Sequence, residues 1–481
     1  MSMICSSQSA LESFRFRWPL ISLLGVHISL LAWSGYCHSP SQNEIGHLPA
    51  GIAIWQYGRF DLYRVNPPLV KLLAAAPVCV WQPDITLNNY DSSPELRPEV
   101  WIGQRFTESN GNRSFWFFTL ARWACIPLSI LGGWCCFQWA RLLYGERAGL
   151  LALTLWCFSP NVLAHASMIT PDAGAAALGI TATYAYWRWL QKSSWKRSLV
   201  AGALLELAGL TKFTWLVLFP LWPLLWLFWS FSTKDNTSQR RLSRTWPQLA
   251  TILLTALYVI NVGYAFEGSC TRLGDFEFVS ASLSGGDVLA DPNETRNYFR
   301  GSWLGAVPVP VPADFIVGID QQMRDFDRGK PSYLLGEHSD RGWWYYYLVA
   351  LAFKVPLGTW VLAILSIWGF WRFRPGGARL RDQVVLLAPA ITVFVIVSSE
   401  TGFSRHMRYV LPAFPFAFVW VSQVAASVGR CRWLYSVVVL SAVAWSVISS
   451  LSVYPHSLSY FNEFAGGPLG GPKVLLDSNI D

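Results

Sequence analysis

Hydrophobic residues in this chain form long runs that are separated by short polar segments. Eleven of these runs approach the roughly 20 apolar residues that a helix needs to cross a bilayer. They are residues 18–36, 116–139, 148–165, 171–190, 198–211, 213–231, 247–265, 345–371, 383–399, 409–428 and 433–453. The pattern predicts an all-α polytopic membrane protein with about eleven transmembrane helices.

Basic residues decide whether 198–231 forms one kinked helix or two helices. With eleven crossings and a cytoplasmic N-terminus, every short cytoplasmic loop is rich in Lys and Arg, as the positive-inside rule requires. A single span across 198–231 would move the later basic clusters to the other side. We therefore predict two spans that turn near Lys212. The basic loops hold Arg141 and Arg147, then residues 188–197, 234–244, 372–381 and 430–432.

This orientation puts two long loops, 38–115 and 266–342, on the non-cytoplasmic side. Residues 45–55 of the first loop carry apolar side chains with the spacing of one helix face. Only part of such a segment can be buried, so we predict a helix that lies along the membrane surface. Pro49 is costly inside a helix. We expect the helix to begin near it, with Glu44 in the preceding turn.

Composition supports the membrane assignment and limits which classes of partner are expected. The chain is 53% hydrophobic and only 14% charged, whereas soluble proteins carry about 25% charged residues. Its net charge of +8 resides between the hydrophobic runs. This charge therefore orients the protein in the lipid bilayer and predicts no nucleic-acid partner.

The sequence contains none of the common cofactor motifs. A Walker loop and a G-x-G-x-x-G turn after a strand are absent, so a soluble nucleotide donor is not expected. The nine cysteines form no CxxC pair, which favours packing over metal or redox chemistry. HExxH and similar metal spacings are also absent. The one cofactor left open is a divalent cation held by carboxylates.

Ionisable residues at membrane depth, or just outside it, gather on the non-cytoplasmic side. Each is costly in hydrocarbon, so each needs a partner or a wet cavity. This asymmetry predicts a site that faces outward. The members are Glu44, His47, Arg64, Lys71, Arg122, His165, Asp172, Lys212, Lys354, Arg405, His406 and Arg408.

Two acids could act as a general base toward an acceptor hydroxyl. Glu44, beside Asn43, would then lie at the mouth of the site; the alternative is a solvated acid on an interfacial turn. Asp172 would be the second candidate. Its alternative role is an acid at a helix N-terminus, where the helix dipole favours it. His165, seven residues earlier, could simply end the preceding helix.

The cations could stabilise a departing phosphate, because positive charge is needed where the negative charge develops. Arg405 and Arg408 are three residues apart at the start of a predicted helix, with Tyr409 beside them. The alternative for the arginines is contact with lipid headgroups. Lys354 would lie at membrane depth if the run 345–371 is one continuous helix.

Taken in order, these segments resemble membrane glycosyltransferases of family 39, the dolichyl-phosphate-mannose–protein mannosyltransferase and aminoarabinose transferase type. The resemblance covers nearly the whole chain and implies the GT-C fold. The segments that carry it are NEIGHLPAGIAIWQYGRFDLYRVNPPL, LARW…LLYGERAG, SPNVLAHASMITPD, GLTKFT, GWWYYYLVALAFKVPL and RHMRYVLPAFPF.

The resemblance implies roles for these residues. The family's first outer loop carries an Asp-Glu pair whose acid is the catalytic base, and this pair falls on Asn43 and Glu44. Asn43 is an amide and cannot accept the proton, so Glu44 or Asp172 takes the role, or activity is weakened or lost. The implied phosphate-binding residues are Arg122, Lys212, Lys354, Arg405 and Arg408. We expect His47, Arg64, Asn66, His165 and Tyr409 to contact substrate.

The resemblance also bears on domain organisation and localisation. Residues 1–465 would form the GT-C-type domain, and 466–481 would begin an outer C-terminal region that this chain truncates. We expect a multi-pass protein of the plasma (inner) membrane with a cytoplasmic N-terminus.

The leading hypothesis is a hexosyltransferase. It would move a mannose-like or similar sugar from a polyprenyl-phosphate carrier to a hydroxyl of an acceptor protein, lipid or glycan on the outer face. Two alternatives remain: a transporter or flippase of lipid-linked glycans, and a catalytically silent lipid-binding subunit.

Overall fold

The structure is a computed structural model that describes residues 2–87, 90–94, 96–232, 238–286, 296–373, 379–429 and 433–475. Parts of three predicted basic loops (234–237, 374–378 and 430–432) and residues 476–481 of the predicted C-terminal region lie outside the described residues.

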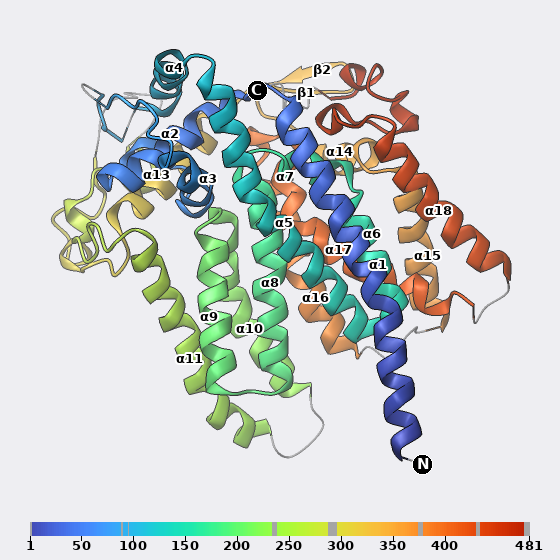
Figure 1. Cartoon of the computed structure of the whole chain (residues 1–481). Coiled ribbons are helices and arrows are strands. Elements are labelled where there is room, and N and C mark those ends of the chain that lie inside the picture. The colour runs from blue at the N-terminus through green and yellow to red at the C-terminus, as the bar shows by residue number, and fades with distance from the viewer. Residues whose placement is uncertain are drawn as a thin grey trace.

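Helices occupy all the predicted apolar runs and form a bundle (Figure 1). Seven helices of the described chain are long and apolar enough to cross a membrane, and nine if each of two bent pairs counts as one span. The all-α polytopic architecture is thus confirmed, while the number eleven stays a prediction. The bundle comprises α1 Ser2–Cys37, α5 Arg113–Tyr144, α6 Glu146–Cys157, α7 Pro160–Ala166, α8 Pro171–Gln191, α9 Trp195–Gly209, α10 Leu218–Phe231, α11 Ser238–Gly263, α14 Tyr346–Lys354, α15 Leu357–Phe373, α16 Leu380–Ser399, α17 Phe414–Val421 and α18 Trp433–Leu451.

Two predicted runs are broken rather than continuous. The run 345–371 divides into α14 and α15, which meet at 112°. Val355 between them is extended, and Pro356 follows. The residue before a proline disfavours the helical conformation, so the chain bends here. Helices α6 and α7 meet at 58°, with Pro160 at the start of α7.

Four shorter helices and a small hairpin cover the end of the bundle opposite the N-terminus, which we call the site end (Figure 1). They come from the two long loops of the sequence. The elements are α2 Gln42–Tyr57, α3 Leu69–Cys79, α4 Glu99–Asn110, α13 Ala313–Arg328, and the antiparallel strands β1 Ser332–Leu334 and β2 Glu337–Ser339.

Helix α2 begins at Gln42, seven residues before Pro49, so the expected start near Pro49 is wrong. The backbone N–H and hydroxyl of Ser41 both donate to the Glu44 carboxylate, at 2.9 and 3.0 Å. This capping arrangement satisfies a donor that a helix start otherwise leaves unpaired. Pro49 has no N–H to donate to the carbonyl of Ile45, and Gly103 of α4 packs against that carbonyl.

The core of the bundle is built around α8, whose inward residues are small. Residues 173–179 are Ala and Gly except for Leu178, and all of them are buried. A side chain at Gly179 would collide with the indole of Trp215, and that indole donates to the carbonyl of Ala175 at 2.8 Å. Close packing fixes the turn between α9 and α10, and with it Lys212.

Candidate active site

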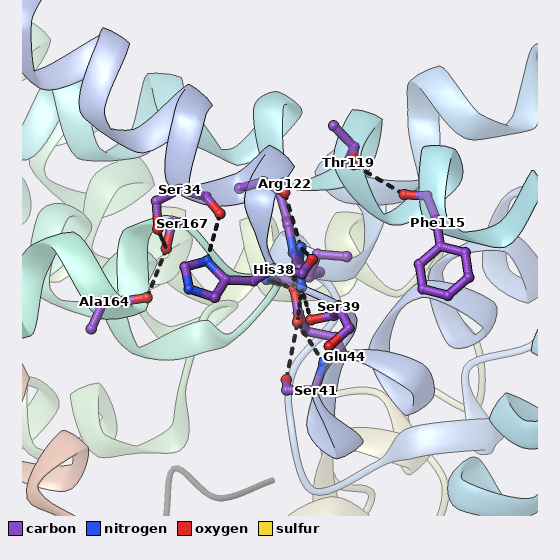
Figure 2. Close-up of polar contacts among 12 residues, drawn as sticks. Ser34, His38, Ser39, Ser41, Glu44, Phe115, Thr119, Arg122, Ala164 and Ser167 are labelled. Atoms are coloured by element: carbon purple, nitrogen blue, oxygen red, sulfur yellow. Dashed lines mark hydrogen bonds and ion pairs between the residues drawn. The ribbon is translucent and has the colours of Figure 1, made fainter. Parts of the chain in front are cut away.

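Glu44 and Arg122 form a fully buried ion pair behind the first turn of α2 (Figure 2). Arg122 donates to both carboxylate oxygens, at 2.7 and 2.6 Å. Its remaining N–H groups reach the carbonyls of Gly35, His38 and Ser39. The pair therefore ties α5 to the end of α1 and the start of α2.

The Glu44 carboxylate is saturated with donors. It also accepts the N–H of Ile169 at 2.9 Å, in addition to the bonds from Ser41 and Arg122. Burial disfavours its charge, but Arg122 and these hydrogen bonds outweigh burial and hold the pKa of Glu44 below its usual value. Its exposed fraction is 0%, and Glu44 does not line the cavity described next.

A polar cavity of about 370 Å³ opens at the site end, between α2, α4, α13 and the first turns of α8 and of the helical segment 407–413. Cations outnumber acids among its described lining residues. The cations are Arg97, Lys212, Lys330, Arg405 and Arg408, and the acids are Glu99, Asp172 and Asp325. The excess of positive charge suits an anionic ligand.

One wall of the cavity carries the predicted acid of α8 together with predicted cations. Lys212 Nζ lies 2.7 Å from Asp172 Oδ1, and Arg408 Nε lies 4.0 Å from the other carboxylate oxygen. Lys212 is in an extended conformation at the break after α9, which directs its amine toward the start of α8. Three segments far apart in sequence thus meet at Asp172.

Two more predicted residues complete this wall. Tyr409 lies under the amine of Lys212, 4.9 Å from ring centre to nitrogen. Arg405 lines the cavity, and its guanidinium makes no hydrogen bond or ion pair within the described part of the chain. An arginine with free donors in a cavity is suited to bidentate phosphate contact.

Another wall of the cavity contains a cluster that we call the Arg97 cluster: Arg97, Glu99 and Asp325. Arg97 Nε donates to Glu99, and Nη1 donates to Asp325 of α13, both at 2.6 Å. The guanidinium also lies 5.8 Å from the ring centre of Tyr63. This cluster joins the first long loop to the second.

An apolar groove of about 360 Å³ adjoins the polar cavity. The two share Lys212, Gln322 and Tyr409. Side chains from the 3₁₀ helix Phe213–Val217, from α13 and from α16 line the groove, among them Leu216, Val217, Ile319, Met323, Phe326, Val393, Ile396 and Val397. A molecule with a charged head and a hydrocarbon tail could occupy both spaces at once.

Other residues that were predicted to be catalytic or to contact substrate also line the cavity. Asn43, Asn66 and His47 do so from the first long loop. Burial and the nearby charge of Lys71 lower the pKa of His47 to about 3, so its imidazole is neutral. Lys71 lies behind this wall and donates to the carbonyls of Tyr63 and Asn66, at 2.6 and 2.7 Å.

Besides Glu44 and Lys71, four predicted residues do not line the cavity. Arg122 is committed to Glu44, as described above. Lys354 ends α14, where its amine donates to the carbonyl of Leu458 at 3.1 Å. Arg64 pairs with Asp314 at 2.5 Å, and His165 is buried on α7. Lys354 lies away from the cavity because the chain bends at Pro356. The continuous helix 345–371 that its predicted position assumed does not form.

Several lining residues were not predicted from the sequence. Arg97 and Lys330 lie in irregular parts of the long loops, Glu99 begins α4, and Gln322 and Asp325 lie on α13. The only available signal was their charge within outer loops, which many solvated residues share. Among the described residues there is no group of three or more His, Cys, Asp or Glu that could hold a metal ion.

Comparisons with known proteins agree with the fold. Residues 101–264 match the family described as dolichyl-phosphate-mannose-protein mannosyltransferase. No curated protein sequence matches the chain.

Two solved structures share the architecture at low sequence identity. One is ArnT from Cupriavidus metallidurans bound to undecaprenyl phosphate, with a TM-score of 0.52 and 14% identity. The match covers 91% of this chain and 66% of ArnT. The other is the oligosaccharyltransferase of Archaeoglobus fulgidus, with a TM-score of 0.50 and 10% identity. That match covers 90% of this chain and 52% of the archaeal protein.

The chain thus spans just under two thirds of ArnT and about half of the archaeal protein. The family resemblance inferred from the sequence is confirmed over residues 101–264, which match the dolichyl-phosphate-mannose-protein mannosyltransferase family, and the chain shares the GT-C fold of the two structures.

Proposed function

We propose that this protein transfers a hexose from a polyprenyl-phosphate carrier to an acceptor hydroxyl at the site end of the bundle. The observation that carries the proposal is the junction between the polar cavity and the apolar groove at Lys212, Gln322 and Tyr409. A lipid phosphate has a charged head and a hydrocarbon tail, so its binding site needs a polar space and an apolar space that adjoin. The similar ArnT structure, which contains undecaprenyl phosphate, supports this type of donor.

The phosphate would lie against Lys212, Arg405 and Arg408, and the polyprenyl chain would extend along the groove. Arg405 has free donors, and the other two cations are already held in place by Asp172. Such preorganised charge stabilises the leaving phosphate without reorganisation during the reaction.

The proposed reaction is a single displacement with inversion. The acceptor oxygen attacks the anomeric carbon while the bond from this carbon to the phosphate oxygen breaks. The phosphate leaves with the electron pair of that bond, and the acceptor proton passes to a carboxylate. We assign this role to Asp172 rather than Glu44, because Asp172 lines the cavity and Glu44 lies behind it with its oxygens fully occupied.

The basic loops support a cytoplasmic N-terminus, which would place the site end on the outer face of the membrane. We propose the plasma membrane as the location and a protein, lipid or glycan hydroxyl as the acceptor.

Turnover of a labelled polyprenyl-phosphate hexose by the purified, reconstituted protein tests the proposal. Release of polyprenyl phosphate together with a glycosylated acceptor supports it. Movement of the intact lipid between leaflets would instead indicate a flippase. Binding without bond cleavage, across a panel of acceptors, would indicate a silent lipid-binding subunit.

A further inference from the structure

The polar cavity has two chemically different walls, and the proposed reaction uses only one of them. Asp172 and the cations beside it account for the phosphate and the proton. The Arg97 cluster has no part in these steps, although it faces the same space. Its polar groups therefore need another explanation.

Several polar atoms of the Arg97 cluster make no hydrogen bond to the described chain. Within the described chain, Arg97 Nη2 and one carboxylate oxygen each of Glu99 and Asp325 have no hydrogen-bond partner. Two cavity-lining atoms that are nine-tenths buried or more, His47 Nδ1 and Thr170 Oγ1, also lack a partner there. Buried polar atoms are nearly always hydrogen-bonded, so His47 Nδ1 and Thr170 Oγ1 point to a ligand in the cavity. The side chains of the Arg97 cluster are 5–34% exposed, so their unused polar atoms are accessible to the same ligand.

The charge of the cluster excludes the phosphate as that ligand. Arg97 is already paired with two carboxylates, so the cluster carries one positive and two negative charges. A phosphate would be repelled here and attracted to Arg405 and Arg408 instead. A neutral polyol fits, because each hydroxyl both donates and accepts a hydrogen bond, and the cavity offers donors and acceptors side by side.

We infer that the Arg97 cluster binds the hydroxyl groups of the transferred sugar and determines which hexose is accepted. This inference rests on the proposed function and names the sugar-binding half of that site. A pocket built to hydrogen-bond a hydroxyl strongly rejects a ligand that lacks it, because its own polar groups are then left unpaired.

Binding measurements with two ligands, polyprenyl phosphate and polyprenyl-phosphate hexose, test the inference. Asp325→Asn and Glu99→Gln keep the shape of the wall and remove a charged acceptor. We expect each variant to lose about 10- to 100-fold in affinity for the sugar-bearing lipid. Affinity for the bare lipid phosphate should be unchanged, because the phosphate contacts the other wall.

Asp314→Asn is the matched control. The Arg64–Asp314 pair, at 2.5 Å, also joins the first long loop to α13 but does not line the cavity. This variant should bind both lipids as the unmodified protein does.

Donors that lack one sugar hydroxyl provide a second readout. The unmodified protein should bind at least one such donor markedly more weakly than the full sugar, and Asp325→Asn or Glu99→Gln should reduce that difference. If the variants lose affinity for both lipids equally, the cluster only maintains the shape of the cavity, and the inference is overturned. Failure of the unmodified protein to bind either lipid would instead reject the proposed function.

Discussion

Two acid–base pairs near the site end look alike in sequence but occupy opposite environments. Glu44 and Arg122 are almost completely enclosed, with side-chain exposures of 0% and 2%, and their hydrogen bonds go to backbone groups, to the Ser41 hydroxyl and to each other. Asp172 and Lys212 lie 2.7 Å apart at the edge of a cavity. A saturated buried pair holds the architecture together, whereas a pair beside a cavity can change its partners during a reaction.

The sharpest test of this contrast is the substitution Asp172→Asn. We expect transfer to fall by about 10²- to 10⁴-fold, the usual contribution of a general base, while the protein stays folded. Turnover of a labelled donor measures the effect, and a thermal unfolding curve checks the fold. If Asp172→Asn retains full transfer while folded Glu44→Gln loses it, the roles of the two acids are reversed.

The structural role of the other pair predicts a loss of stability. Arg122→Met leaves Glu44 as a buried charge without its partner, which costs about 3–5 kcal/mol. Unfolding in detergent should therefore occur at markedly lower temperature or denaturant concentration.

Glu146→Ala supplies the control for Arg122→Met. It removes the Arg141–Glu146 pair, whose atoms are 3.4 Å apart and whose side chains are about one third exposed (36% and 33%). The resulting decrease in the free energy of unfolding should stay below about 1 kcal/mol. Equal effects of the two variants would contradict a special role for the buried pair.

A smaller effect should distinguish free from committed cations. Arg405→Ala removes a guanidinium that faces the cavity, and charge-assisted hydrogen bonds contribute about 1.5–3 kcal/mol. Affinity for polyprenyl phosphate should fall by about 10- to 100-fold. Arg105→Ala serves as the control, since Arg105 stacks on Trp101, 4.1 Å from its ring centre, and does not line the cavity. Unchanged binding by Arg405→Ala would remove Arg405 from the phosphate site.

The smallest effect concerns Lys71, which holds the loop of Tyr63 and Asn66. Burial lowers the pKa of Lys71 from 10.5 to about 7. Between these values the unfolded chain binds one proton more than the folded chain, so the free energy of unfolding rises with pH. Relative to Lys71→Met, this rise should be about 1.4 kcal/mol per pH unit between pH 7.5 and 9. A difference that does not change with pH would show that Lys71 keeps its proton.

The sequence was a good guide to the bundle and a partial guide to the site. Hydrophobic runs located the helices because apolar length is set by the bilayer itself. Breaks were harder to predict, since a proline such as Pro356 bends the chain while Pro127 lies inside the continuous helix α5. The cavity wall at Asp172, Lys212, Arg405 and Arg408 was found because charge in an apolar context is conspicuous.

The residues that were missed or misplaced share a different property. Arg97 and Asp325 are 228 positions apart, and each lies in a polar segment where one more charge carries no signal. Glu44 and Arg122 were both singled out, but not as partners. Their pairing depends on how α1, α2 and α5 meet, which the spacing of 78 residues does not indicate.

Helix α13 has a consequence for how this protein could diversify. Its Asp325 faces the proposed sugar, its Ile319, Met323 and Phe326 face the proposed lipid chain, and Gln322 borders both. A substitution that shifts or tilts α13 would change the polar cavity and the apolar groove together. We therefore expect preference for sugar and preference for carrier length to shift jointly in evolved or engineered variants.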